Sequence, residues 1–133
     1  MGKIKKQKKL NYIIKLEIYP FDIMFSFNET DEELIKTLDK YGIDHADHPW
    51  QFETDKHGIG RTCIFASGQT LVRLPMWPER SEDYGVLQHE IFHAVEYLFY
   101  RIGMNLKKCS GEAYAYLIGF ITTDIYKQIN KKA

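Results

Sequence analysis

The chain of 133 residues is 44% hydrophobic and 14% aromatic, which is enough apolar content for one sizeable core but not for two. Its 18 basic and 18 acidic residues give a formal net charge of zero, so global charge favours neither nucleic acid nor an acidic substrate as a partner. Two cysteines are too few for a disulfide framework, and no apolar stretch has the length of a membrane span. We therefore expect a cytoplasmic protein without a signal peptide or a transmembrane segment.

The first ten residues differ in composition from the rest of the chain. They contain five lysines, which leaves the other 123 residues with a net charge of minus five. Such a run is typical of a solvated terminus, and a weak contact with nucleic acid or an anionic membrane is the minor alternative. The sequence predicts a flexible Lys-rich tail over residues 1–10 and a single domain over residues 11–133, with no specific nucleic-acid partner and no membrane partner.

The front half of this domain reads as a scaffold. Tyr12–Tyr19 and Phe21–Phe27 both alternate in the manner of strands, and a proline separates them, so they form either a bent strand or a pair. A Thr-x-x-Glu capping box then predicts a helix over residues 30–41, which Gly42 ends.

The segment Ile43–Gly60 has a loop-like composition and carries His45, Asp47, His48 and His57. Their spacing suits no helix, so a structural role is favoured over a second metal site. If this loop borders a cleft, His57 or Arg61 is expected to bind a substrate carbonyl or terminus.

Two further strands are predicted at Arg61–Ala66 and Thr70–Pro75. A short connection that contains Gly68 makes a hairpin the natural arrangement. The chain then enters a long helical segment through residues 79–85.

The most informative stretch of this segment is a His-Glu-x-x-His motif in an apolar run. Residues four apart lie one above the other on a helix, so His89 and His93 form a two-imidazole clamp for a metal. Glu90 leaves the helix from the side, where its carboxylate can reach a metal-bound water without being a ligand. Because the surrounding residues are apolar nearly all round, the pattern predicts a buried central helix, which Gly103 ends.

A hydrolytic zinc site needs a third protein ligand. A second helix is predicted over residues 110–130, with Glu112 in its first turn, and the eighteen residues between His93 and Glu112 allow the chain to return beside the motif. Glu112 is therefore the expected third ligand. Glu96 also lies on the histidine face, but three ligands in line along one helix fit tetrahedral coordination badly. Close approach of the two helices is expected through the small residues Ala113, Ala115 and Gly119.

Candidates for stabilising an oxyanion lie beside this ligand. Tyr114 and Tyr116 are the phenols nearest to Glu112 in the sequence, although a core or interface role is favoured for both. Cys109 is an inhibitory thiolate ligand or, as we favour, an idle thiol.

A His-Glu-x-x-His motif followed after eighteen residues by glutamate resembles the zincin metallopeptidases, and among them the gluzincins. The resemblance covers about residues 84–124. It implies that His89, His93 and Glu112 bind Zn²⁺ and that Glu90 is the general base. In zincins an edge strand borders the metal cleft and binds an extended peptide, so one of the two predicted hairpin strands is the candidate.

The resemblance has limits that the sequence defines. Tyr116 stands where larger gluzincins often have an acidic residue, and the metzincin pattern fails because Glu96 and Phe99 replace its glycine and third histidine. The short chain and the segment Glu112–Gly119 are similar to small uncharacterised zincin-like proteins of phages and prophages.

The sequence therefore predicts an α+β, minimal zincin-like domain: a small, mostly antiparallel sheet with one N-terminal helix, an active-site helix and a C-terminal helix. The predicted activity is zinc-dependent hydrolysis of a peptide or protein substrate, with iron or manganese also compatible with the ligand set. Two alternatives stay open. One is a zinc-containing structural or protein-binding module without catalysis, and the other is a metal-free helix whose histidines pair with carboxylates such as Glu112.

Overall fold

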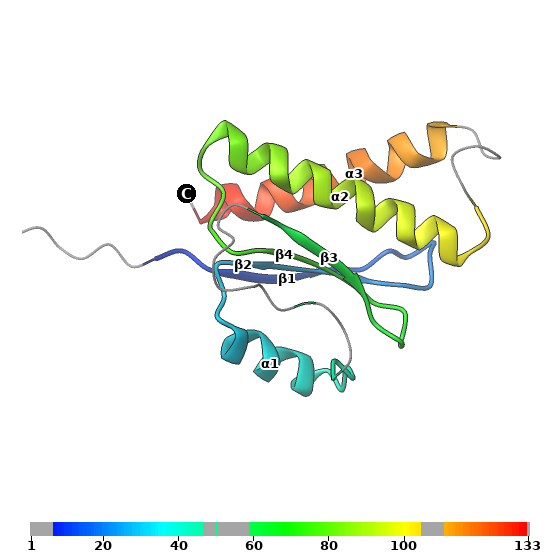
Figure 1. Cartoon of the computed structure of the whole chain (residues 1–133). Helices are drawn as coiled ribbons and strands as arrows, with labels where there is room; N and C mark the ends of the chain where they lie inside the picture. Colours follow the sequence, from blue (N-terminus) through cyan, green and yellow to red (C-terminus); the bar gives the residue numbers. More distant parts are fainter. Residues whose placement is uncertain (1–6, 47–49, 51–58, 105–110, 133) are drawn as a thin grey trace, which may run out of the picture.

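The computed structural model describes residues 7–46, 50, 59–104 and 111–132. They form an α+β fold in which a four-stranded sheet has helices on both faces (Figure 1). The outer pairs of strands are antiparallel and the central pair is parallel, which confirms the predicted fold class and the mostly antiparallel sheet. Across the sheet the strands follow the order β1 (Leu10–Ile14), β2 (Ile23–Phe27), β4 (Thr70–Leu74) and β3 (Arg61–Ile64).

Three layers enclose two cores. Helix α1 (Asp31–Lys40) covers one face of the sheet, and α2 (Ser81–Arg101) and α3 (Gly111–Lys131) cover the other (Figure 1). Because successive strand residues point to opposite faces, Phe25 of β2 enters the larger core under α2 and α3, while Met24 enters the smaller core against α1. Every residue of β2 and β4 is buried, as expected for central strands that are covered on both sides.

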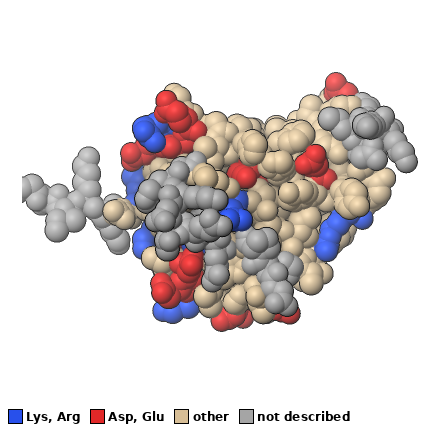
Figure 2. All heavy atoms as spheres, viewed as in Figure 1, with Lys and Arg blue, Asp and Glu red and all other residues tan. Residues whose placement is uncertain are grey.

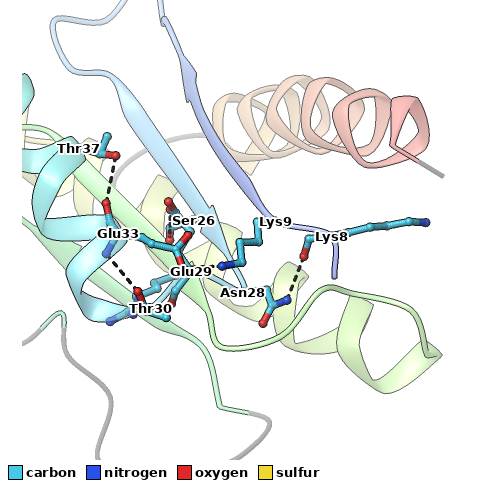
Figure 3. A network of polar contacts seen from close by, with 9 residues as sticks. Lys8, Lys9, Ser26, Asn28, Glu29, Thr30, Glu33 and Thr37 are labelled. Carbon is cyan, nitrogen blue, oxygen red and sulfur yellow. Dashed lines mark hydrogen bonds and ion pairs between the residues drawn. The ribbon is translucent and has the colours of Figure 1, made fainter. Parts of the chain in front are cut away.

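The first strand begins at Leu10, the last residue of the segment predicted as a tail, and Leu10 is buried and pairs with Phe27. Figure 3 shows how this end of the sheet is tied to α1. Lys9 forms an ion pair with Glu33, whose backbone N–H donates to the hydroxyl of Thr30 at 3.1 Å. This hydrogen bond confirms Thr30 as the N-cap of α1.

The predicted strand Tyr12–Tyr19 is also too long. Pairing with β2 stops at Ile14, and the side chain of Ile18 is 85% exposed. The two N-terminal runs are thus a pair of strands and not one bent strand. The hairpin of β3 and β4 is confirmed, and its turn places Gly68 at a φ of 103°, which a residue without a side chain adopts readily.

Some residues of the two long helices that were predicted to be buried are exposed. Gly103, with a φ of 82°, follows the end of α2 as predicted, but α2 is not buried all round, because Tyr100 is 78% exposed. Ala115 and Gly119 are exposed and lie away from α2. None of the described helices is long and apolar enough to span a membrane. The face of α3 that packs inward consists of Tyr114, Leu117, Ile121, Ile125 and Ile129.

Candidate metal centre

The two motif histidines converge on the outer face of α2. His89 Nε2 lies 3.1 Å from His93 Nε2, and the two rings are 4.6 Å apart between centroids. Tetrahedral zinc with Zn–N bonds of about 2.0–2.1 Å holds two nitrogens about 3.3 Å apart. The pair therefore has the spacing of two zinc ligands with little rearrangement.

His93 is held by two further residues of α2. Its Nδ1 atom lies 3.2 Å from Glu96 Oε1, and its ring stacks on Tyr97 at 5.8 Å with an interplanar angle of 21°. When Nδ1–H donates to the carboxylate, the lone pair of Nε2 is left for a metal. Glu96, which the sequence suggested only as a competing ligand, thus contacts the other nitrogen of His93. The sequence did contain a signal for this contact, because residues three apart, such as His93 and Glu96, are neighbours on a helix surface.

Glu90 points away from solvent and towards the sheet. Its side chain is 6% exposed, and the hydroxyl of Thr62 in β3 donates to the backbone oxygen of Glu90 at 3.1 Å and lies 3.4 Å from Glu90 Oε2. A Cβ atom at Gly60 would lie only 2.6 Å from Glu90 Cγ. The start of β3 therefore has no room for a side chain beside Glu90.

Two open hollows flank the histidine pair along β3. Glu90 and His89 both line the first, which has a volume of about 430 Å³ and is bordered by Gly60 just before the strand. The second, of about 510 Å³, lies at the other end of the strand beside Ile64. Because β3 is an edge of the described sheet, the two hollows lie one after the other along the accessible side of the junction between this strand and α2. The remaining residues of the second hollow are mostly aromatic or apolar: Phe92, Glu96, Tyr97, Tyr100, Met104 and Tyr114.

Charge is unevenly distributed around this region. In the view of Figure 2, uncharged residues cover most of the described surface over α2, and charged side chains gather mainly towards the margins. At the start of α2, burial alone would raise the pKa of Asp83, but hydrogen bonds from the backbone N–H groups of Arg80 and Glu79 lower it overall. Within β3, burial raises the pKa of the Cys63 thiol to about 11 despite the nearby charge of Arg61. Cys63 is thus a protonated core residue.

The structure does not bring Glu112 to the histidines. Two contacts fix the antiparallel register of α2 and α3. The ring centroids of Phe99 and Tyr114 are 4.7 Å apart, and Gln88 Nε2 donates to Thr122 Oγ1 at 3.2 Å. This register places the exposed Glu112 level with the C-terminal end of α2, about 10 Å beyond His93 along the helix axis. Among the described residues, no three His, Cys, Asp or Glu side chains form a group that can hold a metal.

The remaining candidates occupy different places. Arg61 is half-buried in β3, and Tyr114 is buried but lines the second hollow. Tyr116 is exposed on the outer face of α3, away from both hollows beside the histidines. His57 and Cys109 lie outside the described residues.

Comparison with known proteins adds no relative. No family model matches the chain, and neither a curated protein nor a solved structure matches it. The geometry of the histidine pair and the resemblance of its motif are what support a functional assignment.

Proposed function

We propose that this protein is a zinc-dependent hydrolase, and specifically a metallopeptidase of zincin type. The observation that carries the proposal is the convergence of His89 Nε2 and His93 Nε2 at 3.1 Å on a solvent-facing helix surface. Glu90 shares a hollow with His89, so a carboxylate is available beside the pair as a base. The histidine pair, the base and the edge strand supply three of the parts that metal-assisted peptide hydrolysis needs, and a third protein ligand completes the site.

His89 and His93 would hold the metal through their Nε2 atoms, and Glu96 would fix the tautomer of His93. Glu112 is the proposed third ligand, and zinc binding would have to draw the first turn of α3 towards the pair. When bound, zinc polarises the substrate carbonyl and lowers the pKa of water towards about 7. Glu90 takes a proton from the attacking water and gives it to the leaving amine.

The proposed substrate is an extended peptide that adds to β3, the edge strand of the described sheet. Backbone N–H and C=O groups of an edge strand can pair with such a peptide, and neighbouring hollows can bind alternate side chains. The two hollows at Gly60 and Ile64 lie where a peptide along β3 would place side chains on both sides of the histidines. Arg61, in this strand, and His57, four residues before it in the sequence, are the proposed contacts for a substrate carbonyl or terminus.

A second candidate function is a zinc-containing binding module without catalysis. It is favoured by the burial of Glu90 against β3, since a base must reach the substrate to act. Neither tyrosine candidate for an oxyanion donor lies beside the histidine pair. Tyr114 packs against Phe99, and Tyr116 is exposed on α3. Catalysis therefore separates the two candidates more sharply than metal content does.

The test compares cleavage of denatured proteins and peptide libraries by the wild type, Glu90→Gln and Glu82→Gln, all purified without chelator or polyhistidine tag. Glu82 lines the same hollow as Glu90 and is exposed, so its variant is the matched control. We expect zinc-dependent fragments from the wild type and from Glu82→Gln, and none from Glu90→Gln. Because glutamine fills the same volume but cannot take the proton, the loss should appear in kcat and not in zinc content. Full cleavage by Glu90→Gln would refute the assignment of the base, and zinc binding without any cleavage would favour the binding module over the hydrolase.

A further inference from the structure

An exposed apolar patch lies on the outer face of α3 and on the neighbouring residues 15–19, and the proposed hydrolase does not use it. We define it by Ile18, Tyr116 and Phe120, whose side chains are 85%, 75% and 55% exposed. Large apolar side chains that gather on a surface commonly mark an interface. The hydrogen bond of 3.2 Å from the Tyr12 hydroxyl to Asp124 places α3 over β1, at the opposite edge of the sheet from β3. A partner bound here would leave the histidine pair open.

Exposed aromatic side chains and open hollows lie next to each other in this patch. Tyr116 and Phe120 border two open hollows, one of about 700 Å³ between α3 and residues 15–19, and one of about 470 Å³ on the outer face of α3. The smaller hollow is lined by Ala115, Gly119 and Thr123, so two aromatic side chains stand beside a groove of small residues. Apart from the adjacent residues and backbone of α3 itself, no described atom lies within 4 Å of the position that a Cβ of Gly119 would take.

We propose that this patch binds a second copy of the chain, with the two α3 helices packed antiparallel about a two-fold axis near Gly119. In such an interface the same residues serve both copies, so the aromatic pair of each copy enters the groove of the other. Ala115 and Gly119 let the helix axes approach closely, because interaxial distance depends on the side chains at the contact. This arrangement accounts for small residues that face away from α2.

The charges that border the patch suit this pairing. Lys15 and Glu17 line the larger hollow, and Asp124 and Lys127 line the smaller one. The charges of these four residues around the patch therefore sum to zero. Residues 15–19 lie beside the N-terminal half of α3, where they share a hollow with Ala113. An antiparallel partner brings its C-terminal half to this place. Lys127 of each copy then meets Glu17 of the other, with opposite charges at both ends of the interface.

Sedimentation velocity of the full chain over a range of concentrations tests this inference. We expect a species of twice the chain mass of 15.7 kDa at micromolar concentration. Phe120→Glu should raise the dimer dissociation constant at least about tenfold, because it places a charge in the groove of the partner. Tyr100→Glu is the control, since Tyr100 is a similarly exposed aromatic residue outside the patch.

A charge exchange makes the test specific for the antiparallel register. Lys127→Glu should weaken the dimer, and adding Glu17→Lys in the same chain should restore part of the affinity. Both residues are exposed, so circular dichroism should confirm unchanged folding of every variant. A wild type that remains monomeric at about 100 μM overturns the inference. The patch would then be left to a different partner. A dimer that Phe120→Glu leaves intact, or one that Tyr100→Glu dissociates, overturns the inference as well.

Discussion

Gly60 and Glu90 are fitted to each other across the junction of β3 and α2, because a Cβ atom at position 60 would come within 2.6 Å of Glu90 Cγ. Gly60→Ala must therefore displace the Glu90 side chain or the start of β3. We expect a loss of kcat with zinc content unchanged, since both histidines lie outside this contact. Gly85→Ala is the matched control, because Gly85 lines the same hollow but, apart from its neighbours in α2, no described atom lies within 4 Å of its Cβ position. Activity equal in the two variants would contradict the proposed role of Glu90.

The contact between Glu96 and His93 predicts a graded effect on metal affinity. Loss of a carboxylate that orients a ligating histidine typically costs about 10–100-fold in affinity, so Glu96→Ala should fall in this range. Glu112→Ala should weaken zinc binding more, because it removes a proposed ligand and not a supporting contact. Competition of each variant with a chromophoric chelator measures the order. The reverse order would show that Glu96, and not Glu112, is the more important carboxylate of the site.

Asp83 predicts a dependence of stability on pH. Its pKa is lowered in the folded protein by hydrogen bonds from the backbone N–H groups that precede α2. A carboxyl with a lowered pKa contributes stability that is complete above its ordinary pKa of 3.8 and is lost as the pH falls below it. Asp83→Ala should therefore lower the free energy of unfolding by about 1 kcal/mol at pH 7 and by less at pH 3.

Urea denaturation at both pH values measures this difference. Glu82→Ala provides the control, because Glu82 is the exposed neighbour of Asp83 in the same helical turn. An effect of Asp83→Ala that is equal at pH 7 and pH 3 would exclude the ionised carboxylate as its cause.

The buried thiol of Cys63 predicts chemical inertness. Burial raises its pKa to about 11, so at pH 8 almost no reactive thiolate is present. In a Cys109→Ser background, iodoacetamide should leave Cys63 unmodified in the folded protein and alkylate it in urea. Mass spectrometry of the intact chain gives the result directly. Rapid alkylation of the folded protein would mean that β3 opens to solvent.

Local signals in the sequence were sufficient to predict where several helices begin or end. Thr30 caps α1, and Gly42 and Gly103 follow α1 and α2 with positive φ angles, because each of these conformations depends on one residue and its immediate neighbours. The alternation that continues to Ile18 was misleading, because a period of two residues does not show where strand pairing stops. Such an end depends on the partner strand.

Features that depend on distant residues could not be read from the sequence. The apolar content of α2 does not show which side has a partner, so the exposure of Tyr100 was unpredicted. The contact of Gly60 with Glu90 joins residues thirty positions apart. The motif spacing did predict that His89 and His93 lie together, because helical geometry alone fixes that relationship.

Zinc content tests the central claim most directly. The wild type, His89→Ala, His93→Ala and the control His45→Ala should be purified without chelator or polyhistidine tag, incubated with zinc at neutral pH, dialysed, and analysed by inductively coupled plasma mass spectrometry. His45 contacts Asp39 and Trp50, away from α2, so its variant should retain zinc. We predict close to one zinc per chain for the wild type and His45→Ala, and a loss of most of it in the other two. A wild type that takes up no zinc would contradict both the metallopeptidase and the zinc-containing module.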